Sequence, residues 1–426
     1  MPMGITGKPA NPLDFDIAKL GYYLFLFVAL FTLIDPFYTG YGAFRVTRDL
    51  GPLKYASLVF GSGAFFFAFV GMLLRAPWHK QPPWRNSLTT AWPLLVFALY
   101  MLVGALTARI YFDIQETFLP FAIGMVGIPL AIILFWGIGQ NMIVARRFMQ
   151  GLLLVLPIVI GWVVAKRMEN GQAFHTEIFL FVPLGAYFFL TLKTRWLAWC
   201  ILAAITFLAV FSYKNTAFLV LLITLGYLLV VRQLHRSSNA TSLKRVLIVY
   251  FLLIVLLIAA AGITYLLINR DTYLPSGNVS VRTYTYGVVF DNFLKSPLYG
   301  GAFADSVLVD LIHHVILNDD RLNTHSDLLD ILAHGGVIGA ALFIWGFYRI
   351  FKRTLIALKS PCPPEVKSVL HGVTLIVSTG IITAAFNSPL LSLSIGILFW
   401  FAVGLQLAIS EYAHQQAHLA PYTDTK

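Results

Sequence analysis

The sequence predicts an all-α, polytopic integral membrane protein with about 12 transmembrane helices. Of its 426 residues, 58% are hydrophobic and only 12% are charged, whereas a soluble protein of this length carries about a quarter charged residues. The mean hydropathy is +0.79. The apolar residues form blocks of roughly twenty, the length that a helix needs to cross the hydrocarbon core of a bilayer. Runs this long and continuous favour helices over a closed barrel.

The apolar blocks give the expected membrane spans in chain order. They lie at about residues 20–40, 55–74, 91–110, 119–138, 148–165, 174–191, 196–211, 216–231, 246–267, 336–351, 368–385 and 389–410. The N-terminus is polar and lacks a short apolar core followed by a small-residue cleavage site, so the first block is expected to be a retained span and not a secretory signal. Two pairs of neighbouring spans have connections short enough for hairpins: 196–211 with 216–231, and 368–385 with 389–410.

Lysine and arginine indicate the orientation of the spans. Most of the 30 Lys and Arg residues fall on one side of the membrane if the N-terminus is cytoplasmic. Cytoplasmic loops carry such an excess. The densest short loops are 145–147, 232–245 and 349–359. Both termini are therefore expected in the cytoplasm.

The longest stretch without a span, residues 268–335, then lies outside, which is the periplasm if the organism is a Gram-negative bacterium. It has a helical pattern of its own and a turn at 295–301, and long loops of this kind are usually functional. We therefore divide the chain into an N-terminal bundle of about nine spans (1–267), a periplasmic catalytic loop (268–335), and about three C-terminal spans with a cytoplasmic tail (336–426).

The end of this loop, "NTHSDLLDILAHGGVIG" (323–339), is unusually polar beside a span. Thr324 fits a helix N-cap with Asp327 three residues on, and Ser326 is an alternative cap. Either cap puts His325 at or beside a helix N-terminus, where the macrodipole disfavours positive charge. Such a histidine stays neutral near pH 7 and can accept a proton. The alternative is a loop histidine without a role, because the loop contains further histidines: His313, His314 and His334.

Two glycines follow in the same stretch. Gly336 and Gly339 lie three residues apart on one face of the expected helix. Small residues at such intervals let membrane helices approach closely. We interpret both as packing residues that fix the depth of the helix carrying His325.

Several cations lie on the expected outer side, against the orientation bias. They are Arg45, Arg48, Lys214, Arg282 and Arg321, with Arg270 beside the last predicted span before the loop. Snorkelling to lipid headgroups is one explanation, above all for Arg45, Arg48 and Arg270. Recognition of an anionic substrate is the other, because arginine suits bidentate binding of phosphate. Arg282 belongs to a segment whose apolar spacing predicts an interfacial helix.

These residues resemble the signature of the O-antigen ligase and polymerase superfamily. The signature is a histidine followed by Asn, Ser or Gln, nine residues, and Gly-x-x-Gly. Here His325-Ser326 precede nine residues and then Gly336-Val337-Ile338-Gly339. The expected topology, with the signature in a large late periplasmic loop, is similar as well. The superfamily also includes oligosaccharyltransferases that glycosylate pilins.

The resemblance implies transfer of a glycan from undecaprenyl pyrophosphate to an acceptor, which in ligases is a sugar hydroxyl of lipid A–core. The family's essential residues are the signature histidine, an earlier arginine of the same loop and a basic residue in an earlier outer turn. They match His325, Arg282 and Lys214. Relatives often have Ser-Arg-Gly at that turn, where this chain has "YKNT" (213–216); lysine keeps the charge but not the bidentate fork.

We therefore expect an O-antigen ligase of the bacterial inner membrane with its active site in the periplasm. His325 would be the general base, and Arg282 and Lys214, with Arg45, Arg48 and Arg321, would bind the pyrophosphate. No metal or other cofactor and no nucleic-acid partner is expected; the partners are the lipid-linked donor, lipid A–core and membrane lipids. Displacement would be direct, with inversion. The alternatives are an O-antigen polymerase, a protein O-oligosaccharyltransferase, or a lipid or glycan transporter of a different class.

Overall fold

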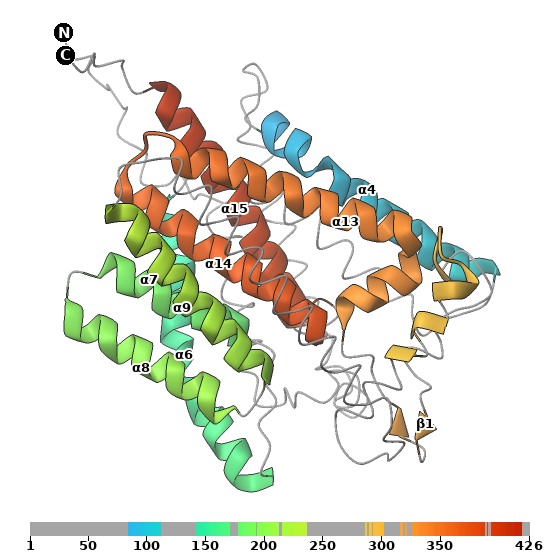
Figure 1. Ribbon diagram of the computed structural model, residues 1–426, viewed down its shortest axis with the longest axis horizontal. Helices are drawn as coiled ribbons and strands as arrows, with labels where there is room; N and C mark the ends of the chain where they lie inside the picture. The colour runs from blue at the N-terminus through green and yellow to red at the C-terminus, as the bar shows by residue number, and fades with distance from the viewer. Residues whose placement is uncertain are drawn as a thin grey trace, which may run out of the picture.

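The computed structural model is a helical bundle (Figure 1). It describes residues 84–111, 142–170, 178–192, 194–212, 215–236, 286–301 without 288 and 292, 316–317, 320–321, 326–387, 390 and 393–419. The helices are α4 (Trp84–Tyr111), α6 (Met142–Asn170), α7 (Ile178–Thr191), α8 (Arg195–Phe211), α9 (Asn215–Arg236), α13 (Asp327–Lys359), α14 (Pro364–Phe386) and α15 (Leu393–Leu419). Two strands of two residues each, β1 (Ile316–Leu317) and β2 (Asp320–Arg321), pair antiparallel.

The helical class and the membrane character predicted from the sequence are confirmed. Within the described residues, three helices are apolar and long enough to cross a membrane: α13, α14 and the Leu88–Ala108 part of α4. The eight helices overlap eight of the predicted spans. The other four predicted spans, 20–40, 55–74, 119–138 and 246–267, lie outside the described residues. The count of 12, the division into three regions and the periplasmic loop therefore stay predictions.

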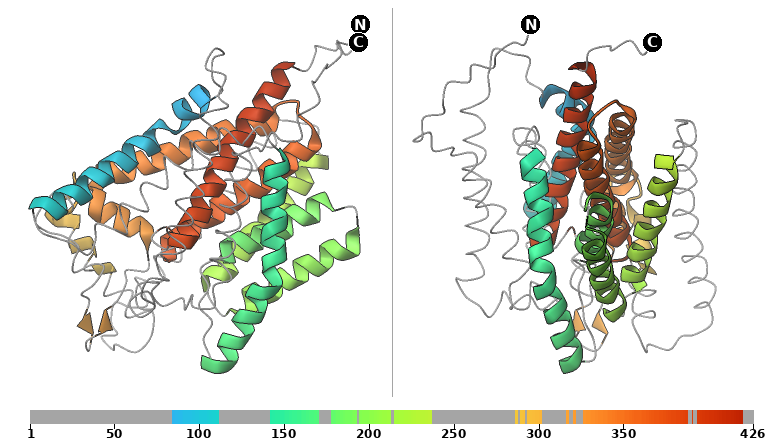
Figure 2. Two further views of the ribbon diagram at one scale, coloured as in Figure 1. Left: turned by 180° about the vertical axis from the view of Figure 1, so that it is seen from behind. Right: turned by 90° about the vertical axis from the view of Figure 1, so that its left-hand side faces the viewer.

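Helix α14 lies in the middle of the bundle and packs against α7, α9, α13 and α15. Helix α13 lies against α4 over much of its length, and the left view of Figure 2 shows the two side by side. Aromatic rings fill the centre: the ring centroid of Phe399 lies 6.1 Å from that of Phe347 and 6.3 Å from that of Phe179. A Cβ atom on Gly380 would lie 2.5 Å from the Phe399 ring, so α14 can approach α15 only with glycine there.

Two prolines inside helices are each compensated by a side chain from another helix. Proline has no N–H, so Pro183 in α7 leaves the carbonyl of Phe179 without its usual helical donor. The hydroxyl of Thr379 on α14 lies within hydrogen-bond distance of that carbonyl, at 3.0 Å, and also of the Leu375 and Ile376 carbonyls of its own helix, at 2.8 and 3.1 Å. In the same way Pro93 in α4 frees the carbonyl of Thr89, and the Arg349 guanidinium on α13 donates to it over 2.7 Å. Backbone groups at membrane depth need such partners because lipid offers none.

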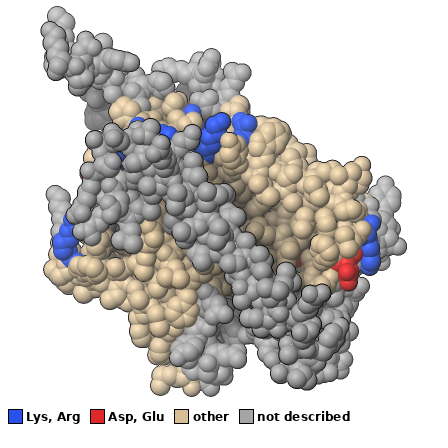
Figure 3. All heavy atoms as spheres, viewed as in Figure 1, with Lys and Arg blue, Asp and Glu red and all other residues tan. Residues whose placement is uncertain are grey.

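Basic side chains gather at the end of the bundle where α13 and α15 finish. The Arg353 guanidinium on α13 pairs with the Glu411 carboxylate on α15 over 2.6 Å, and Arg146 on α6 pairs with Glu365 at the start of α14. Figure 3 shows most of the blue atoms of the visible face along this edge, with a wide uncharged surface beyond it. The residues are Arg146, Arg349, Lys352, Arg353, Lys359 and Lys367.

Removing the Thr379 hydroxyl should destabilise the bundle through the carbonyl that Pro183 exposes. We expect Thr379→Val to lower the free energy of unfolding by about 1 kcal/mol, the usual size of an interhelical hydrogen bond in a membrane. The measurement is thermal unfolding of the purified protein in detergent. Ser378→Ala is the matched control, because the hydroxyl of Ser378 donates to the Thr374 carbonyl within its own helix. In a Pro183→Ala background the cost should shrink, since an alanine at this position supplies an N–H to the Phe179 carbonyl; an equal cost in both backgrounds would contradict this explanation.

Candidate active site

The helix that follows the signature histidine begins at a serine cap. Ser326 has extended backbone angles (φ −153°, ψ 102°), and its hydroxyl accepts a hydrogen bond from the N–H of Leu329 over 3.3 Å. The alternative cap is therefore confirmed, and the prediction of Thr324 as the cap is wrong. His325 immediately precedes this cap in the sequence and itself lies outside the described residues.

Asp327 is the first residue of α13 and not the third, so it does not close a capping box. It reaches instead to the segment between α14 and α15. Its N–H donates to the carbonyl of Asn387 over 3.2 Å, and its carboxylate accepts from the N–H of Leu390 over 2.6 Å. The Asp327 side chain is buried, as is Asp330 one turn later. Tertiary bonds to Asn387 and Leu390, which no local pattern reveals, hold the helix start at Asp327.

Helix α13 breaks at the first glycine of the signature. Gly336 has φ +60° and ψ −163°, a conformation essentially restricted to glycine. The prediction that Gly336 and Gly339 share one face of a continuous helix is therefore wrong. The helix has a short arm, residues 327–335, and a long arm, residues 337–359, which Figure 1 shows as two ribbons meeting at a corner.

The turn that the sequence predicts at 295–301 fills this break. The N–H groups of Val337 and Ile338 open the long arm, and they donate to the carbonyls of Pro297 and Leu298 over 2.9 and 3.3 Å. A Cβ atom on Gly336 would lie 2.5 Å from the Leu298 oxygen. One on Gly300, whose φ is +85°, would lie 2.2 Å from the His334 oxygen. Two glycine backbones therefore cross where no side chain fits.

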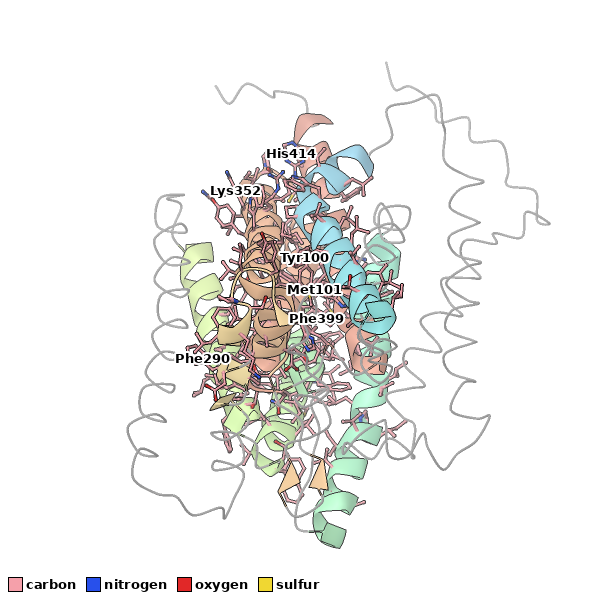
Figure 4. The ribbon with its side chains drawn as sticks, turned by 90° about the vertical axis from the view of Figure 1, so that its right-hand side faces the viewer. Tyr100, Met101, Phe290, Lys352, Phe399 and His414 are labelled. Carbon is pink, nitrogen blue, oxygen red and sulfur yellow. The ribbon has the colours of Figure 1, made fainter. Side chains whose placement is uncertain are left out.

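Helix α4 supports the same corner from the other side. The Tyr100 hydroxyl donates to the carbonyl of Tyr299 in the turn over 2.7 Å. Cβ atoms on Gly335 and Gly339 would both face the Met101 sulfur, at 2.8 and 3.6 Å. Figure 4 shows Tyr100 and Met101 on the part of α4 that lies beside α13. The packing interpretation of Gly339 fits these contacts, but its partner glycine on that face is Gly335.

The segment before the turn is helical at residues 286–287, 289–291 and 293–295. Val289 is buried, whereas Phe290 and Leu294, four residues apart, are each 56% exposed. Leu298 and Tyr299 extend this exposed apolar surface. Such a face suits the interfacial helix that the sequence predicts for this region.

The start of α9 meets the same end of the bundle. The side-chain amide of Asn387 at the end of α14 donates to the Thr216 hydroxyl over 3.0 Å, and the Asn387 carbonyl accepts from Asp327 as described above. Thr216 follows Lys214 by two residues, and Asp327 follows His325 by two. Thr216 and Asp327, each two residues from a predicted site residue, therefore both bond to Asn387.

The structure describes some of the predicted site residues and not others. Ser326 is the helix cap, Gly336 the break and Gly339 a packing residue. Arg321 belongs to β2, where it pairs with Ile316. His334, to which the sequence assigns no role, is buried beside the break. The remaining predicted residues lie outside the described part of the chain: His325, Arg282, Lys214, Arg45 and Arg48.

Three residues of this corner were not predicted from the sequence. Asn387, Gly300 and Tyr100 act through bonds or close approaches to segments far away in the chain. Of the three, only Gly300 could have been found from the sequence, because "YGG" (299–301) ends a stretch that is predicted to form a turn. Asn387 and Tyr100 sit in or beside apolar runs and have no distinguishing local pattern.

Comparison with protein families bears directly on this corner. Residues 200–344 match the family model described as O-antigen ligase. This stretch is an O-antigen ligase-type domain. It runs from α8 through the turn and the break of α13, and it contains every predicted site residue except Arg45 and Arg48. Together with the apolar helices, this match supports a membrane protein with a glycosyltransferase-like function that involves lipid-linked glycans. No curated protein matches the chain.

The two signature glycines of this O-antigen ligase-type domain should respond differently to alanine. Gly336→Ala would place a Cβ on backbone atoms of the turn and strain the backbone, so we expect a loss of at least about 3 kcal/mol of stability. Gly339→Ala meets its neighbours at 3.6 Å or more, which is ordinary contact, and should stay within about 1 kcal/mol of wild type. Thermal unfolding in detergent measures both.

Gly161→Ala in α6 is the control, because a Cβ there would meet no atom within 4 Å in the described part of the chain. Its melting temperature should equal or slightly exceed that of wild type. Equal destabilisation by Gly336→Ala and Gly339→Ala would contradict the crossing of Gly336 with the turn.

Proposed function

We propose that this protein is an O-antigen ligase, which moves an O-antigen glycan from undecaprenyl pyrophosphate to a sugar hydroxyl of lipid A–core. The observation that carries the proposal is the short arm of α13. Its cap, Ser326, directly follows the signature histidine, and its end, Gly336, is the first signature glycine. Both lie within the stretch that matches the O-antigen ligase family.

The reaction needs a base and positive charge, and no other chemistry. The acceptor hydroxyl oxygen attacks the anomeric carbon of the donor while the bond from that carbon to the pyrophosphate oxygen breaks. The hydroxyl proton passes to His325, and the bonding electrons leave with the pyrophosphate. One displacement of this kind inverts the anomeric configuration and requires no covalent enzyme intermediate.

His325 suits the role of general base because it directly precedes the N-cap of a helix. The positive end of the helix macrodipole disfavours an imidazolium and so favours the neutral ring that a general base requires. Such a base contributes about 10²–10⁴-fold to the rate. Arg282, Lys214, Arg45, Arg48 and Arg321 would neutralise the departing pyrophosphate, a task for which fixed cations are effective and no metal ion is needed.

The distribution of charge supports a periplasmic active site in the inner membrane. The basic end of the bundle, where α13 finishes, fits the cytoplasmic face under the positive-inside rule. Figure 4 shows Lys352 and His414 at that end and Phe290 toward the other. Helix α13 begins away from the basic end, so Ser326 and the neighbouring His325 would face the periplasm, with both termini in the cytoplasm.

Two close alternatives use the same donor. An O-antigen polymerase would transfer to a growing glycan, and a protein O-oligosaccharyltransferase would transfer to a hydroxyl of a protein. A transporter of lipid-linked glycan belongs to a different class and would need no general base. The acceptor therefore separates the enzymes, and the dependence on His325 separates all three from a transporter.

The deciding experiment combines purified protein, lipid-linked glycan and lipid A–core in detergent. We expect glycan on lipid A–core, and we expect His325→Ala to lower kcat by about 10²–10⁴-fold. His313→Ala, a histidine of the same loop outside the signature, should retain full activity. Transfer only to glycan or to protein would replace the ligase proposal with one of its close alternatives. Full transfer by His325→Ala would remove the general base.

The contribution of Arg282 can be divided into charge and geometry. A lysine preserves the charge but cannot bind phosphate through two parallel N–H groups. If bidentate binding matters, Arg282→Lys should fall nearly as far as Arg282→Ala, by about 100-fold in kcat/KM. Arg270→Ala in the same loop is the control and should change kcat/KM less than about threefold, as expected of a residue that contacts lipid headgroups. Full activity of Arg282→Ala would exclude it from the site.

A further inference from the structure

One asparagine joins three helices at the end of the bundle where α13 begins. The N–H of Asn387 donates to the carbonyl of Thr383 over 2.8 Å and completes α14. Its carbonyl accepts from the N–H of Asp327, the first residue of α13. Its side-chain amide donates to the hydroxyl of Thr216, in the first turn of α9. These three groups of Asn387 therefore each bond a different helix.

The geometry of Asn387 makes these bonds specific. Its backbone is extended (φ −149°, ψ 178°), which turns its carbonyl away from α14 and toward α13. The residue is 6% exposed, and an unpaired amide in such a place costs about 1–3 kcal/mol. The Thr216 hydroxyl satisfies that amide, so the start of α9 is held where the side chain of Asn387 ends.

A second bond fixes the start of α13 to the same segment. The Asp327 carboxylate accepts from the N–H of Leu390, three residues after Asn387, over 2.6 Å. A hydrogen bond to an ionised group is about twice as strong as a neutral one. Backbone and side chain of Asp327 thus bind two points of the 387–390 segment, which prevents the helix start from rotating about a single bond.

We infer that Asn387 is a positioning residue that holds the outer turn before α9 against the start of α13. The inference rests on the proposed function, in which Lys214 binds the pyrophosphate and His325 takes the acceptor proton. Each of these residues is two positions from a residue that Asn387 bonds, Thr216 and Asp327, and two residues of chain reach at most about 7 Å. Asn387 therefore links the two described helix starts that lead directly to these residues.

Catalysis depends on this separation more than substrate binding does. A misplacement of 1 Å can lower the rate by about 100-fold without removing any group that contacts the substrate. Thr216→Val removes the hydroxyl with little change of shape, and Asn387→Ala removes the amide. We expect each to lower kcat by about 10- to 100-fold and to change the KM for the donor less than about threefold. The double variant should be no slower than the slower single variant, because both remove one bond.

Two further variants distinguish positioning from general stability. Thr216→Ser keeps a hydroxyl and should retain at least about half of kcat. Thr383→Val lies one turn before Asn387, is equally buried, and loses only a hydrogen bond within its own helix; its kcat should equal that of wild type. Equal losses in Thr383→Val and Thr216→Val, or independent multiplicative losses in the double variant, would overturn the inference.

A labelling measurement tests the inference without relying on the glycan-transfer reaction. In a background with Cys200→Ala and Cys362→Ser, Lys214→Cys is introduced in the turn that the Asn387 amide holds, and the rate of its reaction with a water-soluble maleimide is measured. Asn387→Ala and Thr216→Val should change this rate at least about threefold, and Thr383→Val should not. An unchanged rate overturns the inference even if activity falls. If the wild-type protein transfers no glycan, the proposed function fails, while the labelling rates still decide whether Asn387 holds the turn that contains position 214.

Discussion

The crossing of Gly300 and Gly336 is the contact on which the candidate site depends. Where α13 breaks, Val337 and Ile338 lose their helical acceptors, and the carbonyls of Pro297 and Leu298 replace them. A free N–H at membrane depth costs several kcal/mol, so the turn and the long arm of α13 stabilise each other. The two backbones approach too closely for a Cβ on either glycine. The loop that contains Arg282 is thereby tied to the helix that follows His325.

The same constraint, that every backbone group must find a partner away from water, governs the rest of the bundle. Pro183 and Pro93 each free a carbonyl, and Thr379 and Arg349 bind the two carbonyls from neighbouring helices. These bonds fix the rotation and depth of α7 against α14 and of α4 against α13. Near the candidate site most of the bonds between segments are made by neutral polar groups, whereas the described salt bridges lie at the basic end.

The sequence predicts what depends on local composition and misses what depends on distant contacts. Hydropathy locates the segments that become α4, α6–α9 and α13–α15, because burial in lipid imposes a length and an apolar content on each segment alone. The break at Gly336 is not predicted, since a glycine in an apolar helix looks the same whether it packs or kinks. Thr324 and Ser326 both satisfy the cap pattern, and the choice follows from the bonds of Asp327 to Asn387 and Leu390.

The fixed spacing of the signature gains a physical meaning from the two ends of the short arm. Between Ser326, the cap, and Gly336, the break, lie the nine residues of one short helix, about 13.5 Å long. Its far end is fixed by the turn and its near end by the 387–390 segment. One inserted residue would rotate the cap by about 100° and shift it by about 1.5 Å relative to the break. Both ends could not then keep their partners. A histidine directly before the cap therefore keeps its place relative to the loop only when nine residues separate cap and break.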